Sequence, residues 1–255
     1  MNQRKTTQSV LLFLQIIITL VYGAMLVYIT MLIYEEKPNS FWDDIIGYLP
    51  QFVILVSSII PQIVLRAKRK LHSQDGEIFP LLFTMVALQV TLVVPMFTKV
   101  TGILVFSPSF LVIFGRFSLL GTAALFLISS LRYYGFSSSK IGYYNTAILI
   151  ASLLISMLAP ISSFQKENIM NVFNSEYDVF IQVAILLMYT ATILTLLIYA
   201  IKDKSPINTR RFFGFTFVII GLYLSTSYEY LEAIISSILY MTGIIILTFN
   251  TRESF

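Results

Sequence analysis

The sequence is dominated by long apolar runs, and these runs limit the possible folds more than any motif does. Each run is close to the roughly 20 residues that a helix needs to cross the ~30 Å hydrocarbon core of a bilayer. Only 12% of the 255 residues are charged, whereas soluble domains carry roughly 25%. A soluble protein of this composition would expose a large apolar area to water. We therefore predict an all-α polytopic transmembrane helix bundle, with residues 1–255 forming a single integral membrane domain.

Eight of the apolar segments are predicted to be membrane spans. They lie at residues 10–34, 45–65, 79–97, 109–131, 141–161, 177–201, 212–227 and 231–249. The last two are short, and the only charges between them are Glu229 and Glu232, so seven spans with one long bent segment is the alternative. We favour eight because a helix over residues 212–249 would be about 57 Å long at 1.5 Å per residue, nearly twice the core thickness.

The basic residues predict which side of the membrane each loop occupies. With the N-terminus in the cytoplasm, thirteen of the 17 Lys and Arg residues fall in inner segments. The exceptions are Lys37, Lys99 and Lys166 in outer loops and Arg116 inside a span. Cytoplasmic loops carry an excess of Lys and Arg. We therefore predict a multi-pass protein of the cell membrane with both termini in the cytoplasm.

Arg116 is the basic residue that the predicted loops leave within the bilayer. A charge at the bilayer centre costs from about 3 to over 10 kcal/mol. Arg116 precedes Arg132 by about 24 Å of helix, which places it near the outer boundary, where its side chain could snorkel to the headgroups. The alternative is that Arg116 faces the bundle and pairs with an anionic ligand or with a carboxylate, for which Asp178 at the outer mouth of the sixth span is the first candidate.

Glutamines are the other candidate ligand-binding residues. Gln51 and Gln62 each follow a proline in the second predicted span, eleven residues apart, so they share one face if that helix is regular. Prolines free backbone carbonyls, and glutamine side chains bond across helix bundles. Gln89 in the third span and Gln15 in the first are also expected to face protein rather than lipid. Helix packing is the alternative to substrate contact for each of them.

The sequence lacks the residue patterns typical of catalysis or of a tightly bound cofactor. The chain has no cysteine, and its single histidine, His72, lies in a basic inner loop, which excludes thiolate and histidine-based metal sites. Phosphate-binding glycine motifs and the GxSxG nucleophile motif are also missing from the sequence. We therefore expect no cofactor and no metal, and the chemistry favours a function other than catalysis.

These features favour a small permease or the membrane subunit of a transporter. Proline-containing spans, buried polar groups and Arg116 support this interpretation. The alternatives are a sensory or signalling bundle that acts through a separate cytoplasmic partner, and a scaffold or assembly subunit of a membrane complex. The lipid bilayer is the expected partner and nucleic acid is not, while the basic stretches Arg66–Lys70 and Lys202–Arg211 could also dock a cytoplasmic protein such as an ATPase.

Overall fold

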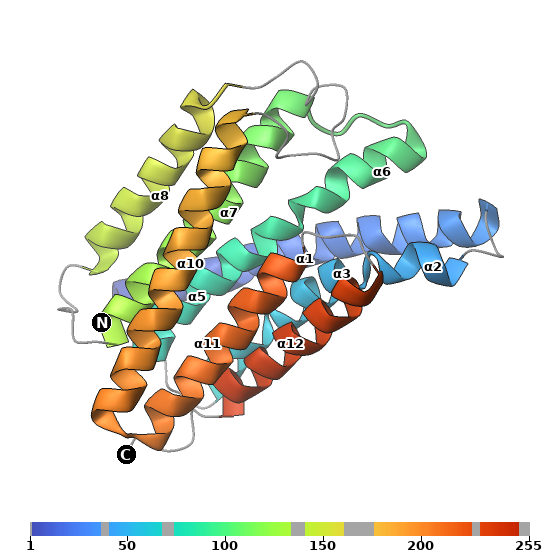
Figure 1. The fold of residues 1–255 in the computed structure, drawn as a ribbon. Helices are drawn as coiled ribbons and strands as arrows, with labels where there is room; N and C mark the ends of the chain where they lie inside the picture. Colours follow the sequence, from blue (N-terminus) through green and yellow to red (C-terminus); the bar gives the residue numbers. More distant parts are fainter. Residues whose placement is uncertain are drawn as a thin grey trace. The chain divides into compact units, whose positions relative to one another are not determined.

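The computed structural model describes residues 2–36, 41–67, 74–133, 141–160, 176–225 and 230–249. Within these ranges the chain forms helices and no strands, which confirms the predicted all-α class (Figure 1). The helices are α1 (Asn2–Glu36), α2 (Phe41–Ile46), α3 (Leu49–Ser57), α4 (Ile60–Ala67), α5 (Gln74–Gln89), the 3-10 turn η1 (Val90–Leu92), α6 (Val93–Thr101), α7 (Pro108–Tyr133), α8 (Ile141–Leu158), α10 (Glu176–Asp203), α11 (Pro206–Leu224) and α12 (Tyr230–Phe249).

Among the described residues, six helical stretches are long and apolar enough to cross a membrane. They are Thr6–Glu35, Leu49–Ala67, Asp75–Thr98, Pro108–Tyr133, Val179–Asp203 and Tyr230–Thr248. The other two predicted spans coincide with α8, which is a shorter apolar helix, and with α11, which carries Arg210 and Arg211 in its first turns. The eight-span count and the cytoplasmic position of both termini therefore stay predictions.

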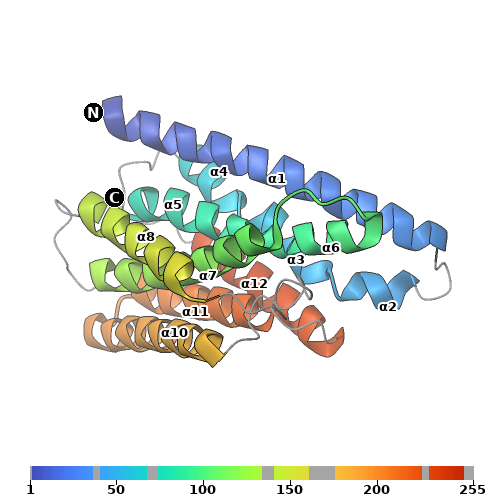
Figure 2. The same cartoon turned by 90° about the horizontal axis from the view of Figure 1, so that it is seen from above.

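The chain divides into two compact units. The first contains Met1–Val90 and Ala200–Phe255, and the second contains Thr91–Tyr199. In the first unit, α12 packs along α11 and also against α3 and α4, and α1 packs against α5 and α3. In the second unit, α7 packs along α8, as both views show (Figures 1 and 2). The prediction of a single membrane domain is not tested by these packing relations.

Helices α11 and α12 form a close antiparallel pair (Figure 1). Gly221 of α11 lies against Tyr240 and Ser236 of α12, and about two turns away along α11 Gly214 lies against Gly243. The Ser236 hydroxyl donates to the Gly221 carbonyl over 2.8 Å. The stretches Pro206–Leu224 and Tyr230–Phe249 are therefore two antiparallel helices and not parts of one long bent helix, while the residues that join them, including Glu229, lie outside the described ranges.

The second predicted span is interrupted rather than regular. Pro50 lies in the first turn of α3, where a missing N–H removes no helical hydrogen bond. Pro61 cannot donate to the Ser57 carbonyl four residues earlier, and the chain makes a turn at Ser58 and Ile59 between α3 and α4. The prediction that Gln51 and Gln62 share one face required a regular helix, and the helix is not regular between them.

A third proline, Pro80, lies inside α5 and is accommodated by a neighbouring helix. Because Pro80 has no N–H, the Gly76 carbonyl lacks its usual helical donor. The side chain of Gln8 on α1 supplies a donor instead, with Nε2 at 2.7 Å from that carbonyl oxygen. The buried stripe of α1 thus brings amide groups against α5.

Candidate functional site

Four buried polar side chains meet where α3 gives way to α4. They are Gln15 of α1, Ser58 at the turn, Gln62 of α4 and Thr84 of α5, and we refer to them as the amide–hydroxyl cluster. Each is at most 2% exposed. All four belong to the first compact unit. Burial of this many polar groups is tolerated only if they bond to one another or to the backbone.

Gln15 links α1 to the turn between α3 and α4 and to α5. Its Nε2 atom donates to the Ser58 hydroxyl over 3.0 Å and lies 3.4 Å from the Phe83 carbonyl oxygen of α5. The Ser58 hydroxyl in turn donates to the Leu55 carbonyl over 3.0 Å near the end of α3. The turn between α3 and α4 is therefore held by a side chain from another helix.

Gln62 places its amide nitrogen among three oxygen atoms. They are Gln15 Oε1, the Pro80 carbonyl oxygen at 3.1 Å and Thr84 Oγ1 at 3.3 Å. The Thr84 hydroxyl donates its own proton to the Pro80 carbonyl over 2.6 Å. An amide nitrogen carries two hydrogens, so it cannot donate to all three oxygens at once. With the Thr84 hydroxyl serving the Pro80 carbonyl, the two amide hydrogens are available for Gln15 Oε1 and Thr84 Oγ1, so the cluster is a formally uncharged network in which each of the three oxygens has a donor.

The other two predicted glutamines lie apart from this cluster. Gln51 is buried on α3, and its Nε2 donates to the Ser225 carbonyl at the end of α11 over 3.1 Å. Gln89 is buried at the end of α5, and its Nε2 has no hydrogen-bond partner among the described residues. The three glutamines therefore do not form one site, and Gln62 alone joins a polar cluster of several helices.

Arg116 is fully buried in the second unit and binds the end of a helix. Its Nη1 donates to the Ala159 carbonyl over 2.9 Å and its Nη2 donates to the Pro160 carbonyl over 3.2 Å. These carbonyls follow the last turn of α8, where helical donors run out and the helix dipole is negative. The side chain of Asp178 lies outside the described residues, so its predicted pairing with Arg116 stays a prediction.

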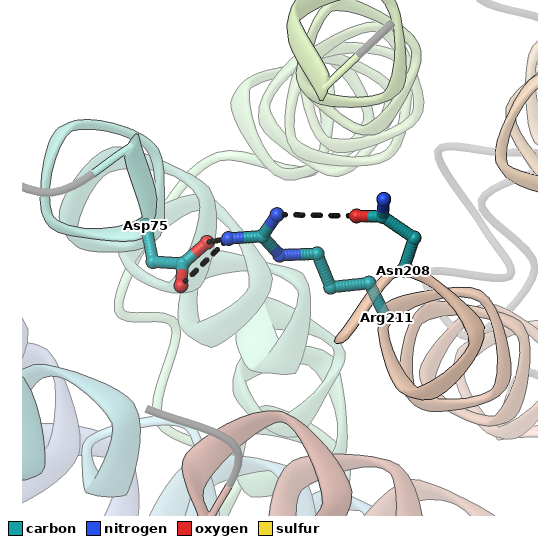
Figure 3. A network of polar contacts seen from close by, with 3 residues as sticks. All are labelled: Asp75, Asn208 and Arg211. Atoms are coloured by element: carbon teal, nitrogen blue, oxygen red, sulfur yellow. Dashed lines mark hydrogen bonds and ion pairs between the residues drawn. The ribbon is translucent and has the colours of Figure 1, made fainter. Parts of the chain in front are cut away.

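A second polar cluster joins the starts of α5 and α11. Arg211 Nη2 lies 3.1 and 3.3 Å from the two carboxylate oxygens of Asp75, and Arg211 Nη1 lies 3.5 Å from Asn208 Oδ1 (Figure 3). Asn208 also donates to Asp203. Sequence reasoning did not select Asp75. Its only signal was its position in a segment predicted to lie on the same side as Arg211.

Comparison with protein families, with curated proteins and with solved structures finds no match for this chain. The described residues contain no group of three or more acidic or histidine side chains that could hold a metal ion. The class of protein is therefore assigned from the fold and the composition alone. The chain is a helical protein with several long apolar helices, as is typical of a protein embedded in a membrane.

Proposed function

We propose that the protein is a small permease, or the membrane subunit of a transporter, with eight spans in the cell membrane and both termini in the cytoplasm. The observation that carries this proposal is the interruption of a span between α3 and α4 beside the amide–hydroxyl cluster. Transporters form their binding sites at discontinuous helices near the bilayer midplane, where backbone carbonyls leave the helical pattern.

The depth of the cluster supports this role. Gln15, Ser58 and Thr84 each lie nine residues from the end of their candidate span that is predicted to be cytoplasmic, namely from Thr6, Ala67 and Asp75. Nine residues correspond to about 14 Å of helix. If these helix ends lie at the boundary of a core about 30 Å thick, all three side chains lie near the midplane.

Contacts within the first unit support the proposed alternation of the segments between the two sides of the membrane. The Asp75–Arg211 pair joins two segments that are both predicted to be cytoplasmic, and Arg66 donates to Ser9 over 3.1 Å between two more. At the opposite ends of these helices, Gln51 contacts the end of α11, and both are predicted to lie on the outer side. The antiparallel pairing of α11 and α12 is the arrangement that eight spans require.

Water access to the cluster tests the proposal. The chain has no cysteine, so Ser58→Cys carries a single thiol, and Ser236→Cys is a matched control in the close contact between α11 and α12. Both serines are fully buried. A charged, membrane-impermeant thiol reagent applied to cells and to inverted vesicles should label Ser58→Cys from at least one side, and much faster than Ser236→Cys. Equal resistance of the two thiols from both sides would contradict a permease.

A further inference from the structure

Two rows of side chains run along α5 from its first turns toward the amide–hydroxyl cluster. The row that contains Thr84 faces α4, where it contacts Gln62. The second row is displaced by one residue and therefore lies about 100° further around the helix. Its members, spaced four residues apart, are Asp75, Phe79 and Phe83. This second row meets α11, so it occupies the space between that helix and α5.

An ion pair joins the second row to α11 at the ends of both helices that are predicted to be cytoplasmic. Arg211 Nη2 lies 3.1 Å from the nearer carboxylate oxygen of Asp75 (Figure 3). Asn208 is buried, accepts from Arg211 Nη1 over 3.5 Å and donates to Asp203 at the end of α10. The side chains of Arg211 and Asp75 are 18% and 14% exposed, so the pair lies at the protein surface and can be reached from it.

An aromatic layer lies one helical turn deeper than the ion pair. Phe79 and Phe215 each follow a member of the pair by four residues, and their rings meet edge to face with centroids 6.2 Å apart. Phe83 meets Phe79 with centroids 5.3 Å apart and ends the row at the cluster, because its carbonyl oxygen lies 3.4 Å from Gln15 Nε2. All three rings are at most 2% exposed. A hydrated or charged solute could not pass such a layer without losing its water.

These two layers connect helices that do not pack closely along each other. Helix α5 packs along α1 and α4, and α11 packs along α12, but α5 and α11 are not a closely packed pair. A local opening needs the loss of few buried contacts. Separation of α5 from α11 has to break the Asp75–Arg211 pair and the Phe79–Phe215 contact, while the pairing of α11 with α12 can stay intact.

We propose that the Asp75–Arg211 pair and the Phe79–Phe215 contact form a gate between the cytoplasm and the amide–hydroxyl cluster, and that this gate is closed in the structure. Opening separates the start of α5 from the start of α11 and lets water reach the cluster from the cytoplasmic side. The gate rests on the proposed permease function, because a gate requires a path that it closes.

The test measures how fast a charged thiol reagent labels Ser58→Cys in inverted vesicles, which expose the cytoplasmic surface. Asp75→Asn and Arg211→Gln should each raise this rate by about two- to fivefold, the factor by which loss of a partly exposed ion pair shifts an equilibrium. The two substitutions change the net charge in opposite directions, so attraction of the reagent to the surface cannot explain a rise in both. Phe79→Leu removes the ring contact, should also raise the rate, and decides the question if the charge variants do not fold.

Two controls separate gate opening from other effects. Arg66→Gln removes the same charge as Arg211→Gln from another segment predicted to be cytoplasmic, but it breaks a contact with Ser9 of α1 and not one with α5. Its labelling rate should equal that of Ser58→Cys alone. Ser236→Cys places the thiol between α11 and α12, and its labelling should not rise when a gate substitution is added.

The outcomes distinguish the gate from the permease. The gate is overturned if the rate from the cytoplasmic side is the same with and without all three gate substitutions, or if the thiols at Ser58 and Ser236 become reactive together. Exchange of Asp75 and Arg211 should return the rate toward that of Ser58→Cys alone, and an exchange that labels as fast as the single variants contradicts the pair. A thiol at Ser58 that resists the reagent from both sides removes the permease and the gate with it, whereas a reactive thiol that ignores the gate substitutions removes only the gate.

Discussion

Gly243→Ala should push α11 and α12 apart. A Cβ atom at this position would lie 2.7 Å from the Gly214 carbonyl oxygen, 2.8 Å from the Val218 amide nitrogen and 2.7 Å from a Val218 methyl carbon. Two of these three atoms belong to the backbone of α11, so a change of side-chain rotamer cannot relieve the contacts. The helices themselves must move.

The size of the effect follows from the displacement required. Close carbon–oxygen contacts between backbones lie at about 3.3 Å or more, so α12 must shift by about 0.6 Å. Overpacking of this kind costs about 1–3 kcal/mol, and a weakened Ser236–Gly221 hydrogen bond adds about 1 kcal/mol. Alanine recovers about 0.5–1 kcal/mol through its higher helix propensity. The net expectation is a loss of about 1–3 kcal/mol.

A second glycine gives a matched control for this prediction. Gly142 lies in the first turn of α8, and a Cβ atom there would meet no atom within 4 Å. Gly142→Ala should therefore be neutral or stabilising by up to about 1 kcal/mol. Thermal unfolding of both variants in detergent shows whether the unfolding temperature falls for Gly243→Ala and stays the same or rises for Gly142→Ala. If Gly243→Ala proves as stable as Gly142→Ala, the close contact between α11 and α12 is refuted, and the single long helix of the seven-span alternative returns.

Three further predictions concern charges and topology. Arg116→Leu removes two charge-assisted hydrogen bonds worth about 1.5–3 kcal/mol each, partly offset by relief of desolvation, so the unfolding temperature of this variant should fall. Arg116→Lys should recover only part of the loss, because an ammonium group lacks the planar two-pronged geometry. A leucine variant as stable as the parent would contradict this prediction. Exchanging Asp75 and Arg211 in a double variant should regain at least part of the stability that either single reversal loses, on the order of 1 kcal/mol for a pair whose side chains are 18% and 14% exposed, and strict additivity would argue against the pair. A reporter active only outside the cytoplasm should be silent after Phe255 and active near Gln165, and activity at Phe255 would refute eight spans.

The positions of the helices could be predicted from the sequence because bilayer thickness sets the length of an apolar run. Every predicted span overlaps a helix of the structure, including the two that fall short as membrane crossings, α8 and α11. The interruption between α3 and α4 was harder to place. Pro61 signalled a kink, but the local pattern did not indicate that a hydroxyl at Ser58 and an amide from α1 would stabilise a complete turn there.

The partners within the site could not be predicted, because they depend on how the helices pack. Gln62 was selected for its type and position, yet its contacts with Gln15 and Thr84 follow from the register of α4 against α1 and α5. One packing signal was available and was not used. Gly214 and Gly221 lie seven residues apart and therefore on one face of α11, where they admit the close approach of α12.

The buried polar side chains share one physical task, which is to give buried acceptors a hydrogen-bond donor. Arg116 binds two carbonyls beyond the end of α8, and Gln51 binds a carbonyl at the end of α11, so each answers a backbone acceptor at a helix end with a donor. Such pairing satisfies the backbone in a medium without water. Around Gln62 the same task is shared by side chains of three helices, because the Gln62 amide donates to Gln15 Oε1 and Thr84 Oγ1 while the Thr84 hydroxyl serves the Pro80 carbonyl. The network therefore ties α1, α4 and α5 together beside the interruption between α3 and α4, where lipid offers no alternative hydrogen-bond partner.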